Sequence, residues 1–159
     1  MKTILILLMT LFSLPIFSQV KSEYERIYEN DTCKQSYLYS KSKMYIADVF
    51  KSANNVIQND DPSFGSLICK GNVSVSNYYF SFTLKIRVKD GSSKITITDV
   101  YNSSAPYKCS TIEINNFRGM FMDNLTKKQY NGIMVRLNKE LEYIVSSYYR
   151  HMDSEDDSF

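Results

Sequence analysis

The feature that most constrains the fold is a strict alternation of apolar and polar positions over residues 79–88. Every second position in this segment is apolar: Phe80, Phe82, Leu84, Ile86 and Val88. A strand with this pattern buries one face and leaves the other in solvent. Asp90-Gly91 follows, a pair typical of tight turns because both central residues favour positive φ. The segment therefore predicts one arm of an antiparallel hairpin, with the second arm over residues 94–100.

Other segments complete a two-layer α+β domain. We expect strands over 20–28 and 67–75, and a short strand over 111–114 inside an otherwise irregular stretch. A helix capped by Ser40 or Ser42 carries an apolar stripe as far as Ile57, and a last helix over 127–152 carries a second stripe. Each helix buries one stripe, so both cover the same apolar sheet face. The predicted fold is a two-layer sandwich, an antiparallel sheet with two helices on one face, in the order β-α-β-β-β-(β)-α.

The first eighteen residues have the three regions of a secretory signal peptide. A basic start at Lys2 precedes an apolar run over 4–12, and the small residue Ser18 ends the segment. The run is shorter than the ~20 apolar residues that span a bilayer. We expect cleavage before Gln19; a buried amino-terminal helix is the alternative. The remaining chain is interpreted as one domain over 19–152 and a disordered acidic tail over 153–159.

Three cysteines enter the oxidising space that export implies. Cys69 shares the apolar side of its strand, so we expect it buried and reduced. Cys33 and Cys109 lie in loop-like segments, and the residues leave open whether they form a disulfide or remain free thiols. Their spacing matches no compact metal motif, so no metal or cofactor is expected.

The sequence offers no motif with a catalytic mechanism. His151 is the only histidine and lies at the carboxyl end of a predicted helix, where a cation is mildly favoured. No glycine-rich phosphate loop is present. The net charge of +2 is too small for a typical nucleic-acid-binding domain. We therefore predict no enzyme activity, no catalytic residue and no nucleic-acid partner.

Two surfaces are candidate binding sites. The first is the polar sheet face, with Lys70, Tyr79, Lys85 and Arg87; the alternative is an ordinary solvated face. The second is the long loop with Phe117, Met120 and Phe121, whose apolar side chains either contact a partner or fold back over the core.

Residues 39–61, followed by Gly65-Ser66-Leu67-Ile68-Cys69-Lys70-Gly71, resemble a family of secreted bacterial proteins described as a domain of unknown function with a TATA-binding-protein-like fold. The turn Lys89-Asp90-Gly91 also fits that pattern. Tyr45 stands where family members usually carry a tryptophan. The resemblance extends over about residues 20–102. It implies a fold and an exported location, and it supplies no catalytic residue.

The resulting functional hypothesis is a non-catalytic binding or adaptor module, secreted or periplasmic, and not a lipoprotein. Its partner would be a protein, peptide or glycan, and the chain would have no transmembrane segment after signal removal. A structural subunit of an envelope assembly is the alternative, and an unrecognised enzyme is a further one. Fold resemblance alone does not favour DNA binding.

Overall fold

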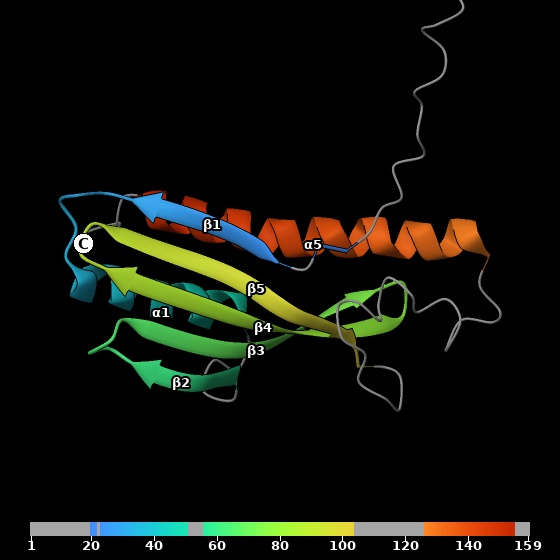
Figure 1. Cartoon of the computed structure of the whole chain (residues 1–159), viewed down its shortest axis with the longest axis horizontal. Helices are drawn as coiled ribbons and strands as arrows, with labels where there is room; N and C mark the ends of the chain where they lie inside the picture. The colour runs from blue at the N-terminus through green and yellow to red at the C-terminus, as the bar shows by residue number, and fades with distance from the viewer. Residues whose placement is uncertain (1–19, 22, 51–55, 104–125, 155–159) are drawn as a thin grey trace, which may run out of the picture.

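β4 (Tyr78–Lys89) is the central strand of a five-stranded antiparallel sheet with the order β1-β5-β4-β3-β2 (Figure 1). The computed structural model describes residues 20–21, 23–50, 56–103 and 126–154. The elements run in the order β1 (Tyr24–Glu29), α1 (Gln35–Val49), β2 (Ile57–Asp61), β3 (Ser66–Val75), β4, β5 (Ser92–Asn102) and α5 (Lys127–Asp153).

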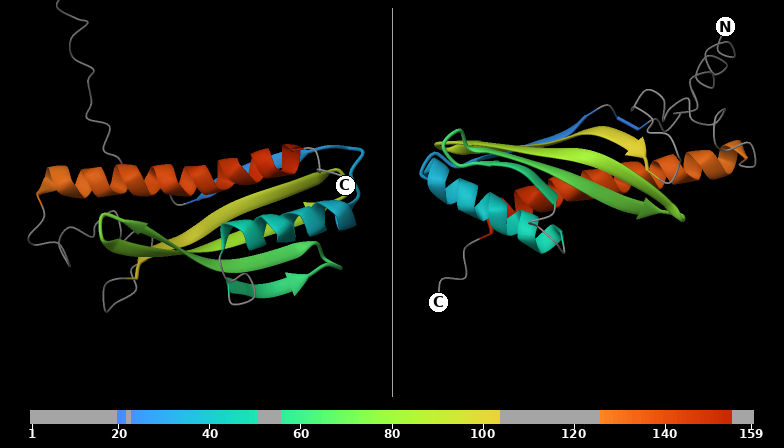
Figure 2. Two further views of the ribbon diagram at one scale, coloured as in Figure 1. Left: turned by 180° about the vertical axis from the view of Figure 1, so that it is seen from behind. Right: turned by 90° about the horizontal axis from the view of Figure 1, so that it is seen from below.

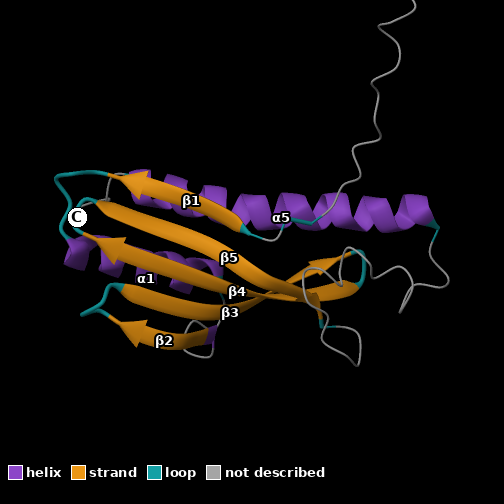
Figure 3. Ribbon diagram, in the orientation of Figure 1, coloured by secondary structure: helices purple, strands orange, loops and turns teal. Residues whose placement is uncertain are grey.

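Both helices lie on the same face of the sheet (Figures 2 and 3). The inward positions of β4 predicted from the alternation are all buried, and four of them are fully so: Phe80, Phe82, Leu84 and Ile86. Ile95 and Ile97 of β5 are also fully buried, as predicted. The two-layer α+β architecture is therefore confirmed.

α5 has the predicted extent and the predicted apolar stripe. The buried side chains of this stripe recur at helical spacing: Tyr130, Ile133, Met134, Leu137, Leu141, Ile144, Val145 and Tyr148. Thr126 and Gln129 form a capping box that satisfies free backbone N–H groups at the start of the helix. The helix is roughly 40 Å long, and its amino-terminal half extends past the start of β1 (Figure 1).

The predicted start of α1 is wrong by about two turns, because the observed N-cap precedes Ser40 and Ser42. The helix begins at Gln35, and its N-cap Lys34 makes no side-chain cap. Instead the Asp90 carboxylate, in the β4–β5 turn, accepts the Gln35 backbone N–H at 2.8 Å. Ser42 is buried within the helix, where its hydroxyl bonds the Leu38 carbonyl at 2.7 Å. The helix is thus capped by a residue distant in sequence.

The predicted end of the first helix is also wrong, because Ile57 begins an edge strand. β2 pairs with β3, and its register shifts between Ile57 and Asn59. Asp60 bonds two α1 side chains, Tyr39 and Lys43, which fix this edge to the helix. The strand that completes the β-α-β-β-β-β-α order is therefore β2; the predicted strand over 111–114 lies outside the described residues.

The β4–β5 turn differs in detail from the sequence expectation. Only Gly91 has positive φ, at 74°, whereas Asp90 does not. Gly91 N–H donates to the Cys33 carbonyl, and its own carbonyl accepts from Asn30 N–H, both at 2.9 Å. The turn is thereby fixed to the β1–α1 connection.

Four further predictions concern the cysteines and the two ends of the chain. Cys69 is fully buried and free, as expected. Cys33 is half-buried, and its proposed partner Cys109 lies outside the described residues, so that disulfide stays a prediction. The predicted signal peptide over 1–18 and residues 155–159 of the predicted tail also lie outside them. The predicted start of the disordered tail is wrong, because Asp153 is the last residue of α5.

Candidate functional site

The sheet face opposite the helices carries the candidate site. On β4 the outward positions are the odd-numbered ones, and the pairing registers place them beside the outward positions of β3 and β5. Near the middle of the sheet this face is partly covered by its own side chains: Thr83 is only 3% exposed and accepts a hydrogen bond from Lys70. Predicted outward residues at the centre are thus less accessible than those at the ends.

Four cations gather at the end of this face that lies beside the β4–β5 turn. We call them the cationic cluster: Lys85, Arg87, Lys89 and Lys94. Arg87 on β4 is the direct cross-strand partner of Lys94 on β5. Lys85 and Lys89 lie two positions to either side of Arg87 on the same face. Like charges directly opposite on a sheet destabilise the pairing, so the sheet's own packing has to offset this arrangement.

Three members of the cluster have no partner among the described residues. The side chains of Lys85, Arg87 and Lys89 make no hydrogen bond or ion pair with that part of the chain, whereas Lys94 pairs with Glu25 of β1 at 2.5 Å. The Glu25 carboxylate raises the pKa of the Lys94 ammonium. The four cations of the cluster therefore outnumber the two carboxylates beside them, Glu25 and Glu29, and the cluster keeps a net positive charge.

A shallow depression of about 380 Å³ lies within the cluster. Strands β1, β4 and β5 line it with both charged and apolar side chains: Ile27, Glu29, Arg87, Val88, Lys89, Ser92 and Lys94. A guanidinium beside ammonium groups can bind a carboxylate in two-point geometry. Ile27, which is 46% exposed, adds an apolar contact.

An exposed phenylalanine lies at the same end of the sheet. Phe64, in the β2–β3 turn, is 79% exposed. Asp61 orders the turn by accepting the Phe64 and Ser63 backbone N–H groups, and Gly65 accepts the Val88 N–H at 2.8 Å. The turn is thus attached beside Arg87. Arginine with aromatic residues is a composition enriched in protein interfaces.

The structure brings some of the predicted site residues together and separates others. Lys85 and Arg87 lie together as predicted, and Lys89 joins them, a residue that the sequence analysis missed although it shares their strand parity. Tyr79 is 58% exposed but lies roughly 26 Å along β4 from Arg87. Lys70 is engaged with Thr83. Phe117, Met120 and Phe121 lie outside the described residues.

The polar groups on the helix side of the sheet act as structural contacts. Hydrogen bonds from Lys43, at 2.7 Å, and from Tyr39 hold the pKa of Asp60 below its ordinary value. Burial, and secondarily Asp60, raises the pKa of Tyr39. Burial also raises the pKa of Cys69 to about 11, so its thiol stays protonated at neutral pH.

His151 also has a structural environment. Its Nε2 lies 3.1 Å from the Lys41 carbonyl, and its ring packs against Tyr45 near the end of α5. Among the residues that the structure describes, no group of three or more potential metal ligands is present. None of the described helices is long and apolar enough to cross a membrane.

Comparison with models of protein families identifies the family of this chain. The model of a domain of unknown function with a TBP-like fold (DUF4468), where TBP is the TATA-binding protein, matches residues 24–102. The chain belongs to this family. The DUF4468 match begins at the first residue of β1 and ends at the last residue of β5, so it contains the whole sheet and α1. The family resemblance noted from the sequence is confirmed.

Solved structures show the same fold. A TBP-like protein from Parabacteroides distasonis matches with a TM-score of 0.64 at 10% identity, over 84% of this chain and 94% of that chain. A DUF4468 family protein from Bacteroides ovatus matches with a TM-score of 0.57 at 11% identity, over 86% and 89%. No curated protein matches the chain. At such identities the likeness extends to the fold alone.

Proposed function

We propose that this DUF4468 protein is a non-catalytic binding module that holds an acidic segment of a protein partner on its open sheet face. The observation that carries the proposal is the cationic cluster. Arg87 faces Lys94 directly, and the side chains of Lys85, Arg87 and Lys89 form no ion pair in the described part of the chain, although the Glu29 carboxylate lines the same depression. An anionic partner would remove the repulsion that the free protein sustains.

The composition around the cluster favours a protein partner over a simple ion. Ile27 and Val88 line the depression between the charges, and Phe64 is exposed in the adjacent turn. A carboxylate would pair with Arg87 or Lys89, while an apolar neighbour in the same partner would cover Ile27. Charge complementarity of this kind steers association and weakens with added salt.

The proposal includes export. The basic start, apolar run and Ser18 of the amino-terminal segment support a cleaved signal peptide. Intact-mass measurement of the protein recovered from the periplasm or medium of an expressing bacterium should give a chain that begins at Gln19. Recovery of the uncut chain from the cytoplasm would refute this part.

The binding proposal is tested with a fluorescent decaglutamate peptide and a double charge reversal, Lys85→Glu with Arg87→Glu. Anisotropy should show binding to the native protein that weakens with salt and falls at least tenfold in the double variant. The matched control is Lys139→Glu with Arg150→Glu, which makes the same charge change on α5. Both variants should keep the melting temperature within a few degrees, because all four side chains are half-buried or exposed.

A partner search then uses the same pair of variants. Native pull-down from envelope extract should recover a stoichiometric protein with the native chain and the α5 control, and lose it with the open-face variant. Equal loss in both variants would show that net charge alone governs binding. Equal retention would refute the sheet face as the site.

A further inference from the structure

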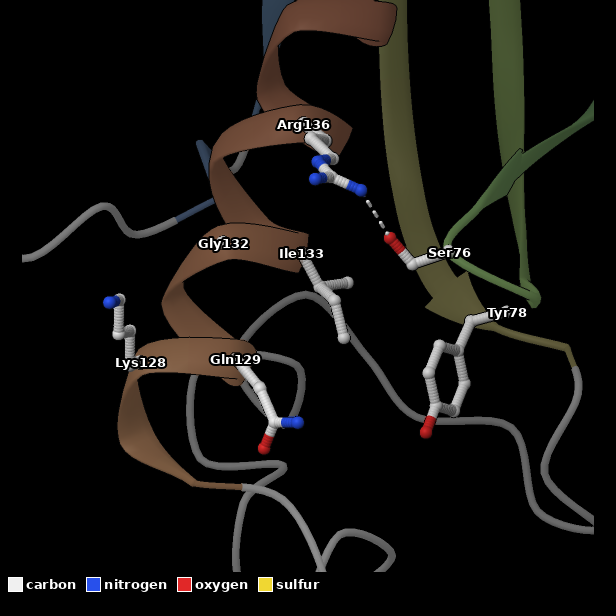
Figure 4. Close-up of a pocket in the computed structure, with 7 residues that line it drawn as sticks. All are labelled: Ser76, Tyr78, Lys128, Gln129, Gly132, Ile133 and Arg136. Atoms are coloured by element: carbon white, nitrogen blue, oxygen red, sulfur yellow. Dashed lines mark hydrogen bonds between the residues drawn. The ribbon is translucent and has the colours of Figure 1, made fainter.

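A second concave site lies far from the cationic cluster, between α5 and the β3–β4 turn (Figure 4). It has a volume of about 480 Å³, within the range of small-molecule sites. Tyr78 is roughly 30 Å along β4 from Arg87. The site is therefore independent of the proposed function, and α5 lies beyond the family match.

Three residues of α5 lie along one helical row and shape this cavity. Lys128, Gly132 and Arg136 are spaced by four residues, so they follow one another on one side of the helix. Glycine leaves a notch between two cations about 12 Å apart along the axis. Ile133 is buried beside the notch, and Tyr78 faces it from the sheet (Figure 4).

Packing among the described residues does not require the glycine. A Cβ added at Gly132 would meet none of their atoms within 4 Å. Glycine destabilises a helix interior relative to alanine, so this position lowers stability with no compensating close approach in that part of the chain. What it provides is space in the cavity.

Of the two cations that line the cavity, Arg136 points across it toward the β3–β4 turn, whereas the Lys128 side chain points away from that turn (Figure 4). Arg136 donates one N–H to the Ser76 hydroxyl at 2.9 Å, which orients the guanidinium and leaves its other donors available. The Lys128 side chain has no hydrogen bond or ion pair with the described residues. No acidic side chain is among the described lining residues.

We propose that this cavity binds an organic carboxylate with an apolar body. The carboxylate pairs with Arg136, and the apolar body lies in the notch over Gly132, against Ile133 and Tyr78. Both halves of the ligand are needed, because the cavity joins cations to an apolar wall.

The test uses 4-phenylbutyrate as the probe and its neutral amide, 4-phenylbutanamide, as the matched compound. In ¹H–¹⁵N NMR of the purified protein, the amides of Ser76, Gly132 and Ile133 should shift saturably with the carboxylate. The neutral amide should bind at least tenfold more weakly. Absence of saturable shifts, or equal binding of the two compounds, would overturn the proposal.

Variants distinguish the effect of Gly132 on ligand binding from its effect on helix stability. Gly132→Ala should raise the melting temperature by ~3 °C through helix propensity, yet weaken probe binding at least tenfold. Arg136→Gln should weaken binding similarly, and Lys139→Ala, on α5 but away from the cavity, should leave it unchanged. Unaltered binding in Gly132→Ala would overturn the proposal. A lower melting temperature in Gly132→Ala would also overturn the proposal. The added methyl group would then clash with protein atoms, which would mean that the protein itself fills the cavity.

Discussion

Removal of the Asp90 carboxylate should destabilise the first turn of α1. The helix has no side-chain cap at Lys34 and no acidic residue in its first turn, so the bond from Gln35 N–H to Asp90, at 2.8 Å, supplies both functions. Loss of a capping acceptor costs about 1 kcal/mol, and loss of a negative charge at a helix amino terminus costs roughly 0.3–1 kcal/mol. Asp90→Ala should therefore destabilise the protein by about 1–2 kcal/mol.

Asp90→Asn separates the two contributions. The amide oxygen can still accept the Gln35 N–H, but the charge is gone, so only about 0.3–1 kcal/mol should be lost. The matched control is Asp48→Ala at the opposite end of α1. Asp48 is exposed in the last turn, where a negative charge opposes the helix dipole, so its removal should leave stability unchanged or slightly higher.

Urea denaturation measures the free energies, and hydrogen exchange locates the effect. The first-turn amide of α1 at Gln35 should lose protection in Asp90→Ala, whereas amides in the middle of α5 should change only with global stability. An unchanged unfolding free energy in Asp90→Ala would refute the capping argument. A loss in Asp48→Ala equal to that in Asp90→Ala would show that charge removal anywhere on α1 is responsible.

Three further changes test other parts of the fold. Arg87→Gln should raise the melting temperature at low salt, with the gain vanishing in 1 M NaCl, because the repulsion from Lys94 is screened; a loss at low salt would contradict the cluster argument. Gly71→Ala should destabilise by about 1–3 kcal/mol in urea titrations, since its Cβ would lie 2.3 Å from the Phe82 ring; a neutral result would mean that the ring moves freely. Asp60→Asn should lower stability at neutral pH, with the difference from the native protein shrinking below about pH 4, because the Asp60 pKa is depressed in the fold and protonation removes its contribution. A difference independent of pH would contradict that assignment.

The elements that the sequence predicts well are those governed by local periodicity. β3 and β4 each bury one alternating set of side chains, and α5 buries one stripe at helical spacing. β5 follows the alternation as far as Ile97; a register shift at Asp99, which has positive φ, then moves burial to Val100 and Asn102. These patterns reflect burial directly, so they survive tertiary folding. The two-layer arrangement follows because each amphipathic element has a single face to bury.

The elements that the sequence misplaces are those governed by contacts distant along the chain. The cap of α1 comes from Asp90, fifty-five residues after Gln35, so the serines that local spacing indicates, Ser40 and Ser42, are not the cap. Ile57 continues an apparent helical stripe, but pairing with Cys69 on β3 makes it part of a strand. The sequence of β2 is polar and therefore gives no strand signal. The strand is held in place instead by the hydrogen bonds that Asp60 accepts from two α1 side chains, Tyr39 and Lys43.

The candidate site was partly predictable for the same physical reason. Strand parity places Lys85, Arg87 and Lys89 on one face, but only the register shows that Lys94 lies opposite Arg87. Cations that only kept the protein in solution would not need to lie together. The folded chain would have a lower free energy if they lay apart, because like charges repel. Their concentration on β4 is sustained by the fully buried side chains beneath, Leu84 and Ile86, which make this strand a rigid support. Like charges placed directly opposite on a strand with fully buried inward side chains are the observation from which we propose an anionic partner.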